Sequence, residues 1–134
     1  MDKRKILVVD DDLLWHRLLR DLFSGMGYDV HCAATCREGV RLAEMYKPDC
    51  ILLDFHLEDG SAVDVCAALK YGAECPRFPV IVVSSDPTAE IVAYAECKAD
   101  YFVLKGSRTM TELPRIVRKV LDDGGRTAAW EPSR

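Results

Sequence analysis

Apolar residues occur along the chain in short unbroken runs, which are separated by longer segments with helical spacing. Four runs are apolar at every position, namely residues 6–9, 50–53, 80–83 and 101–104. Unbroken runs of this length are typical of strands that are covered on both faces, as in a parallel sheet. The mixed segment 28–33 predicts one further strand, which we place at an edge of the sheet.

The segments between these runs predict helices. The first helix is marked by apolar residues that recur three or four positions apart, namely Leu14, Trp15, Leu18, Leu19, Leu22, Phe23 and Met26. Thr35 and Glu38 form a predicted capping box for a second helix, which runs to about Tyr46. A third helix is predicted to open at residues 61–64, and a last one near Thr111.

A fourth helix is predicted to start at Asp86-Pro87, with a capping carboxylate followed by a proline in the first turn. Strand and helix therefore alternate five times, which predicts a doubly wound α/β fold of the flavodoxin-like (βα)₅ type. Right-handed crossovers favour a five-stranded parallel sheet with the order 2-1-3-4-5. We expect one domain over residues 1–124, followed by a short polar tail over 125–134.

Polar side chains follow the predicted strands at the points where they end. Asp10 and Asp11 follow the first strand, Asp54 the third, Ser84 closes the fourth, and Lys105 follows the fifth. The carboxyl ends of parallel strands meet at one edge of the sheet, where open α/β folds bind their ligands. We therefore expect a site that can hold a divalent cation, accept a phosphoryl group and neutralise its oxygens.

Charge and composition narrow the partners and the compartment. A formal charge of −4 argues against a nucleic-acid-binding surface, because duplex binding draws on clustered Lys and Arg. The sequence has no apolar stretch long enough to span a bilayer and no signal-peptide pattern, so we expect a cytoplasmic protein without a membrane partner. Six cysteines without metal-ligand spacing predict reduced thiols and no zinc site.

The five polar and aromatic positions at the strands, taken in order, resemble the receiver domain of two-component response regulators. The pattern is an acidic pair, an aspartate, a hydroxyl residue, an aromatic and a lysine, carried by Asp10-Asp11, Asp54, Ser84, Phe102 and Lys105. The similarity covers about residues 4–122, and the family includes the single-domain chemotaxis regulator. The resemblance implies a protein that assists phosphorylation and dephosphorylation of its own aspartate, rather than an enzyme in the usual sense.

Each site residue takes an expected role from this resemblance. Asp54 would accept a phosphoryl group from a phosphohistidine, and Ser84 and Lys105 would bind the phosphoryl oxygens. Mg²⁺ would be bound directly by Asp11 and Asp54, by Asp10 through water, and by the backbone carbonyl of His56.

The resemblance also implies a switch and two kinds of partner. Phe102 would be the aromatic whose rotamer follows phosphorylation. The phosphoryl donor would be a sensor histidine kinase or a phosphotransfer protein. A downstream protein or a second copy of the chain would bind the face formed by the fourth helix, fifth strand and fifth helix.

Three positions depart from the family pattern. Glu58 stands where the family usually has a proline, and Ala62 where it commonly has a glycine. We expect the loop around Glu58 and Asp59 to adopt another turn and to add negative charge near the site. Gly106 replaces the usual proline after the lysine, so we expect a trans peptide bond and a looser loop.

Two other functions remain open at this point. A receiver-like scaffold could bind its partner without phosphorylation, although the complete acidic set argues against it. A flavodoxin-like cofactor binder or hydrolase could share the fold. Against this, three aspartates follow the first strand where a phosphate-binding loop would be needed.

Overall fold

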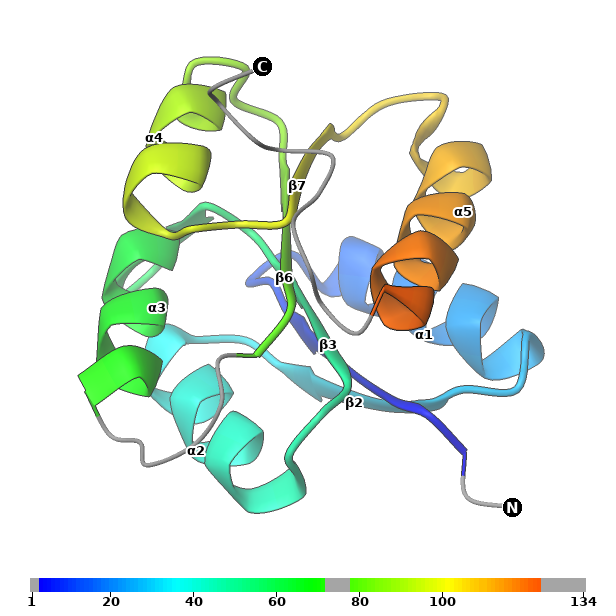
Figure 1. Ribbon diagram of the computed structural model, residues 1–134. Helices are drawn as coiled ribbons and strands as arrows, with labels where there is room; N and C mark the ends of the chain where they lie inside the picture. Colours follow the sequence, from blue (N-terminus) through cyan, green and yellow to red (C-terminus); the bar gives the residue numbers. More distant parts are fainter. Residues whose placement is uncertain (1–2, 72–77, 124–134) are drawn as a thin grey trace.

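The computed structural model describes residues 3–71 and 78–123, which form a five-stranded parallel sheet with helices on both faces (Figure 1). The strands of this sheet are β1 (Lys5–Val9), β2 (Asp29–Ala33), β3 (Cys50–Leu53), β6 (Val80–Ser84) and β7 (Tyr101–Leu104). Their order is β2-β1-β3-β6-β7. The short strands β4 (His56–Leu57) and β5 (Gly60–Ser61) form a separate hairpin. When only the strands of the main sheet are numbered, β6 and β7 are its fourth and fifth strands, so its order is the predicted 2-1-3-4-5.

The five helices divide into two layers. They are α1 (Leu13–Gly25), α2 (Cys36–Tyr46), α3 (Ala62–Tyr71), α4 (Ala89–Glu96) and α5 (Thr109–Asp122). Helices α1 and α5 cover one face of the sheet, and α2, α3 and α4 cover the other (Figure 1). The prediction of a doubly wound fold is confirmed.

The two helical layers explain why the strands are apolar at every position. In β1, Ile6 and Val8 belong to the core under α1 and α5, whereas Leu7 and Val9 belong to the opposite core. All four side chains are buried. The mixed strand β2 lies at an edge of the sheet, as predicted, and most of its residues are only half-buried.

Helix boundaries differ from the predicted ones where a polar side chain stabilises a turn outside the helix. The predicted start of α4 at Asp86 was wrong, because α4 begins at Ala89. The Asp86 carboxylate instead accepts hydrogen bonds from the backbone N–H and the hydroxyl of Thr88, at 2.9 and 2.6 Å. The last helix begins at Thr109, two residues before the predicted position.

The predicted apolar stripe of α1 is narrower in the structure. Leu19 and Phe23 are buried, but Leu14 is 61% exposed and Met26 is 40% exposed. Leu14 lies in the first turn of the helix. The capping box is confirmed, because Thr35 accepts a hydrogen bond from the N–H of Glu38 at 3.1 Å.

Some sequence predictions concern residues outside the part of the chain that the structure describes. The tail 125–134 and Cys75 lie outside the ranges 3–71 and 78–123. Within those ranges, none of the helices has the length and hydropathy that a membrane crossing requires.

Candidate functional site

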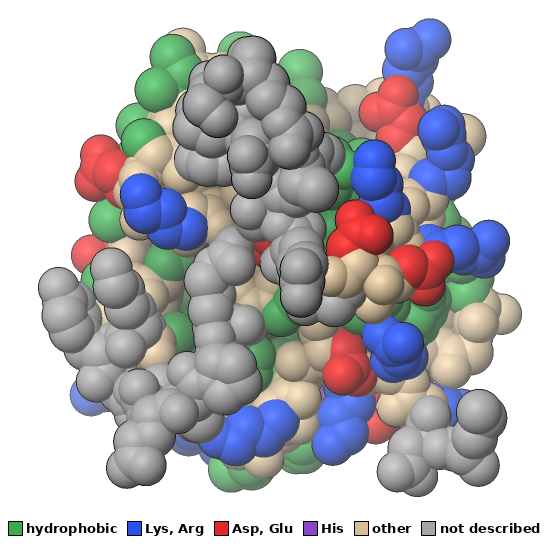
Figure 2. Space-filling view, viewed as in Figure 1, with side chains coloured by type: hydrophobic (Ala, Val, Ile, Leu, Met, Phe, Trp, Pro, Cys, Tyr) green, Lys and Arg blue, Asp and Glu red, His purple; other side chains and the backbone are tan. Residues whose placement is uncertain are grey.

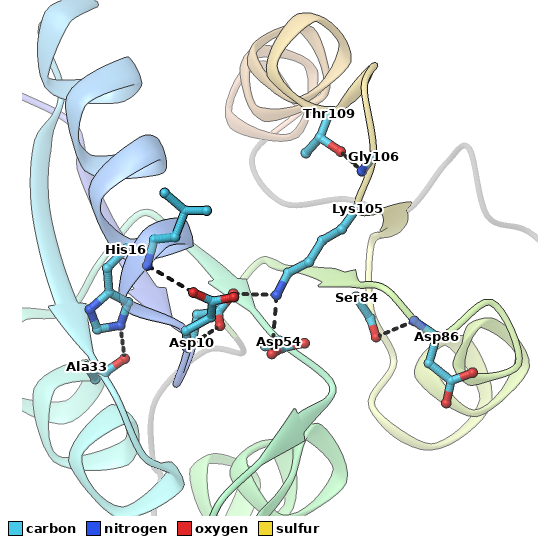
Figure 3. Close-up of polar contacts among 11 residues, drawn as sticks. Asp10, His16, Ala33, Asp54, Ser84, Asp86, Lys105, Gly106 and Thr109 are labelled. Carbon is cyan, nitrogen blue, oxygen red and sulfur yellow. Dashed lines mark hydrogen bonds and ion pairs between the residues drawn. The ribbon is translucent and has the colours of Figure 1, made fainter.

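Three aspartates from two neighbouring strands lie together at the carboxyl edge of the sheet (Figure 3). Asp10 and Asp11 follow β1 and Asp54 follows β3, and the parallel register pairs Val9 with Leu53 just before them. One carboxylate oxygen from each aspartate lies within 4.8 Å of the others. The sequence prediction that these three side chains share one site is therefore borne out as a geometry.

The local backbone fixes where each carboxylate lies. Asp10 and Asp54 are buried, whereas Asp11 is exposed. Asp10 Oδ1 accepts a hydrogen bond from the N–H of Asp12 at 2.9 Å. Asp12 caps α1 by accepting from the N–H of Leu14, also at 2.9 Å. Two buried carboxylates and one exposed carboxylate thus form a cluster of oxygen atoms that is accessible at Asp11.

Lys105 places an ammonium group beside this acidic cluster. Its Nζ lies 2.8 Å from Asp10 Oδ2 and 3.4 Å from Asp54 Oδ2 (Figure 3). The same Nζ lies 5.2 Å from the ring centroid of Trp15 on α1, within the range of a cation–π interaction. Lys105 follows the edge strand β7, which is separated from β1 by β6 and β3, and its long side chain reaches back to the cluster.

The protonation of Asp54 is set by this environment. Burial is the main cause that raises its pKa, to about 6, and the charge of Asp10 acts in the same direction. The nearby Lys105 ammonium opposes the rise. The positive charge of Lys105 therefore does not fully offset the effects of burial and of the Asp10 charge on Asp54. A further positive charge beside the three carboxylates would favour the ionised form of Asp54.

Ser84 lies close by, but its hydroxyl is engaged in its own loop. The side chain is buried, and its Oγ accepts a hydrogen bond from the N–H of Asp86 at 3.1 Å (Figure 3). Because Oγ can also act as a donor, this contact leaves its proton available to another acceptor. A rotation of Ser84 towards Asp54 would break the contact with Asp86.

His56 connects the loop after β3 with the loop after β6, an interaction that the sequence analysis missed. Its side chain is 64% exposed, and Nε2 donates to Asp86 Oδ2 at 2.8 Å. The pair joins residues that are 30 positions apart, so no local spacing could have indicated it. The pKa of Asp86 is lowered to about 2, mainly by Thr88 and then by His56. The metal-binding role of the His56 carbonyl stays a prediction.

The loop at Gly106, which the sequence analysis expects to be looser, is held by hydrogen bonds to a threonine side chain. The N–H of Gly106 donates to Thr109 Oγ1 at 2.8 Å, and the Thr109 hydroxyl donates to the carbonyl of Leu104 at 3.0 Å. Thr109 is fully buried. The peptide bond before Gly106 is trans, as predicted. The backbone on either side of Lys105 is therefore held by one threonine side chain.

The Asp59 carboxylate of the β4–β5 hairpin binds the start of α2. Asp59 accepts hydrogen bonds from the N–H groups of Cys36 and Arg37 at the start of α2, at 2.7 and 3.2 Å. The bond from Cys36 is the main cause that lowers the pKa of Asp59. The start of α2 therefore binds the Asp59 carboxylate, and the expectation that this loop adds negative charge near the site stays a prediction.

Phe102 lies on β7, half-buried against the core under α4. Its backbone N–H points outward from the edge strand and donates to the hydroxyl of Tyr94 on α4 at 2.9 Å. Tyr94 therefore joins α4 to the strand that carries Phe102. The role of Phe102 as a switch stays a prediction.

Comparisons of the whole chain agree with this geometry. The family model of the response regulator receiver domain matches residues 6–118. The DNA-binding response regulator MtrA of Mycobacterium tuberculosis (strain ATCC 25618 / H37Rv) is 28% identical over 114 residues. The match covers 85% of this chain and 49% of MtrA, so the chain spans about half the length of that relative.

Solved structures with the same fold include receiver domains. A CheY-like response regulator receiver domain protein from Methanospirillum hungatei JF-1 has a TM-score of 0.82 at 26% identity, covering 92% of this chain and 97% of that chain. The response regulator TrrA of Thermotoga maritima, in complex with Mg²⁺-BeF, has a TM-score of 0.77 at 22% identity, covering 87% and 98%. At that lower identity the second structure supports the fold alone.

Proposed function

Because the chain belongs to the response regulator receiver domain family of two-component systems, we propose that its Asp54 accepts a phosphoryl group from a partner's phosphohistidine. The partner is a sensor histidine kinase or a phosphotransfer protein. The observation that supports this most directly is the partly neutralised acidic cluster: three carboxylates with oxygens within 4.8 Å of one another, and one ammonium beside two of them. Such a cluster attracts a dication and a group that is transferred with it.

The donor set suits magnesium. Mg²⁺ binds oxygen ligands, usually one or two carboxylates together with waters and phosphate oxygens. Asp11 and Asp54 would bind it directly, Asp10 through a water, and the carbonyl of His56 would complete the protein ligands. When bound, the ion offsets the charge of the carboxylates and of the incoming phosphoryl group.

The residues of the chain then divide the chemistry between them. An ionised Asp54 oxygen attacks the phosphorus, and the phosphorus–nitrogen bond of the phosphohistidine breaks as the phosphorus–oxygen bond forms. The electron pair of the broken bond stays on the imidazole of the partner. Lys105 moves its ammonium from Asp10 to a phosphoryl oxygen, and Ser84 donates its hydroxyl proton to another.

The same movements would carry the signal outward. Turning towards the phosphoryl group, Ser84 gives up its hydrogen bond from the N–H of Asp86. Phe102, half-buried on the neighbouring strand β7, then packs into the space that Ser84 leaves, and Tyr94 transmits the change to α4. The face formed by α4, β7 and α5 therefore differs between the two states.

This face offers a surface for a partner protein or a second copy of the chain. A groove of about 410 Å³ between β7 and α5 is lined by Tyr101, Glu112, Arg115, Ile116 and Lys119. Basic and acidic side chains are interspersed over the α5 side of the molecule (Figure 2). Mixed charge around an apolar residue suits a protein partner whose own charges alternate.

The domain bounds, the compartment and the absence of a nucleic-acid partner are also proposals. We place the receiver domain at residues 1–124 and the protein in the cytoplasm. The MtrA relatives are named DNA-binding response regulators, so they do not support the expectation of no nucleic-acid partner. That expectation rests on the formal charge of −4 alone.

Binding of beryllofluoride, an anionic mimic of the phosphoryl group that binds a carboxylate without a phosphoryl donor, tests the assignment of the site. Calorimetry with Mg²⁺ present should show one binding event for the wild type and none for Asp54→Asn. Asp12→Asn is the matched control, since Asp12 caps α1 and either side chain can do so. Equal binding by wild type and Asp54→Asn would refute the site; a scaffold that works without phosphorylation, or a cofactor binder, would show no binding at all.

A further inference from the structure

The structure holds Lys105 in place through a side chain outside the acidic cluster. Thr109, the first residue of α5, is fully buried, and its hydroxyl makes two hydrogen bonds. It accepts from the N–H of Gly106 at 2.8 Å and donates to the carbonyl of Leu104 at 3.0 Å. Those two groups belong to the residues immediately before and after Lys105.

The Thr109 hydroxyl makes both of these contacts with the loop that precedes the helix. A threonine one position earlier, at the cap, commonly accepts from an N–H in the first turn of the helix. Here the residue at the cap position, Arg108, makes no side-chain capping bond, and Thr109 directs its hydroxyl backwards into the preceding loop. The hydroxyl therefore stabilises the loop rather than the helix to which it belongs.

The loop needs such a contact because Gly106 provides no restraint of its own. Glycine is the residue with the most backbone freedom, and a Cβ at position 106 would meet nothing within 4 Å. The N–H of Lys105 donates to the carbonyl of Ser84 at 2.8 Å. With the two bonds of Thr109, the backbone is fixed at three consecutive residues.

From this arrangement we propose that Thr109 is a positioning residue for Lys105: its hydroxyl fixes the loop so that the ammonium reaches the carboxylates and, on phosphorylation, the phosphoryl oxygens. The inference rests on the proposed function of the site and adds a residue to it. Holding a side chain as long as lysine in one place costs conformational entropy, and a backbone that is already fixed leaves less of that cost to be met. Fixing the backbone therefore concentrates the ammonium where the charge develops.

The matched pair Thr109→Val and Thr109→Ser separates the hydroxyl from the shape of the side chain. Valine has nearly the same volume but no hydroxyl, and serine keeps the hydroxyl without the methyl group. We expect Thr109→Val to weaken the binding of beryllofluoride with Mg²⁺ by about tenfold, the consequence of losing a buried hydrogen bond. Thr109→Ser should bind nearly as the wild type does.

A double-mutant cycle with Lys105→Ala shows whether Thr109 acts through the lysine. If it does, Thr109→Val has no further effect on beryllofluoride binding once Lys105 is absent. If Thr109→Val weakens binding equally in both backgrounds, its role is general stability and the proposal is overturned. Binding by Thr109→Val at the wild-type level overturns it as well.

One measurement needs no variant and covers the case in which Thr109→Val does not fold. In the wild-type protein, the amide hydrogen of Gly106 should be protected from exchange with solvent by its bond to Thr109. Exchange at the rate of an unstructured peptide would show that the contact is absent. A wild type that binds no beryllofluoride would instead refute the proposed function, while protection of Gly106 would still hold.

Discussion

Lys105 forms its shorter ion pair with Asp10 and not with Asp54, the proposed acceptor. The distances from Nζ to the nearest carboxylate oxygens are 2.8 Å and 3.4 Å. In this state the lysine offsets part of the charge of a residue that would help to hold Mg²⁺. In the proposed mechanism the ammonium and the dication would therefore compete for Asp10, and binding of the ion would make the lysine available to the phosphoryl group.

Removing the lysine charge should strengthen metal binding. Lys105→Met keeps much of the side-chain length and deletes the ammonium, so Mg²⁺ no longer competes with it for Asp10. We expect about tenfold tighter binding by calorimetry, well below the full Coulomb energy because the acidic cluster is solvated. Asp11→Asn should weaken binding in the same experiment. Equal affinities for the wild type and Lys105→Met would show that the two cations do not compete.

Asp54 should reduce stability at neutral pH in the absence of metal. Its pKa in the folded protein is raised from 3.8 to about 6, chiefly by burial, so the folded state binds its proton more tightly than the unfolded chain does. The stability linked to this group is fully present below about pH 4 and is lost as the pH rises through about 6. An asparagine at this position avoids the loss.

Denaturant unfolding of Asp54→Asn and the wild type at several pH values measures this effect. At about pH 7 the variant should be more stable than the wild type, by on the order of 1 kcal/mol. This figure allows for the solvent that screens the partly buried charge of Asp54. At about pH 4 the two should coincide. Mg²⁺ should stabilise the wild type more than the variant. An advantage that does not change with pH would contradict the assigned protonation.

Tyr94 should couple α4 to the strand that carries Phe102. Tyr94→Phe removes the hydroxyl that accepts the N–H of Phe102, leaving that group on the edge strand without this partner. We expect a loss of stability of about 1 kcal/mol and faster amide exchange at Phe102. Tyr101→Phe makes the same chemical change on β7, next to Phe102, and should leave the exchange rate of the Phe102 amide as it is. Unchanged exchange at Phe102 in Tyr94→Phe would rule out the coupling.

The His56–Asp86 pair should favour the unphosphorylated arrangement of Ser84. The bond joins His56 to the residue whose N–H donates to Ser84, so it holds the loop in the position that occupies Ser84. In His56→Ala the backbone carbonyl stays and the bond is lost, and beryllofluoride should bind about threefold more tightly. His31→Ala removes a histidine beside Asp29 on the edge strand β2 and should have no effect. Weaker binding by His56→Ala would argue that the pair supports the active state.

The sheet and the positions of the strand-end residues could be predicted from the sequence because their signals are local. Each inner strand is buried on both faces and is therefore apolar throughout, and right-handed crossovers leave few possible orders. Asp10, Asp54 and Lys105 each stand next to such a run, so their meeting at one edge followed from the topology.

The contacts that tune the site could not be predicted, because they join side chains to distant partners. Asp59 binds the start of α2, and His56 binds Asp86, in pairs separated by more than 20 residues. Thr109 is near Gly106 in sequence, but a hydroxyl at a helix start is normally expected to cap the helix. Neither periodicity nor spacing distinguishes such a residue from one that holds a loop.

Covalent phosphorylation measured by intact mass tests the central claim most directly. The wild type, incubated with Mg²⁺ and a small phosphoramidate donor, should gain one phosphoryl group that hydroxylamine removes, as expected of an acyl phosphate. Asp54→Asn should gain none under the same conditions, and Asp12→Asn should behave as the wild type does. If Asp54→Asn gains a hydroxylamine-labile phosphoryl group at the wild-type rate, Asp54 is not the acceptor and the account of this site is wrong.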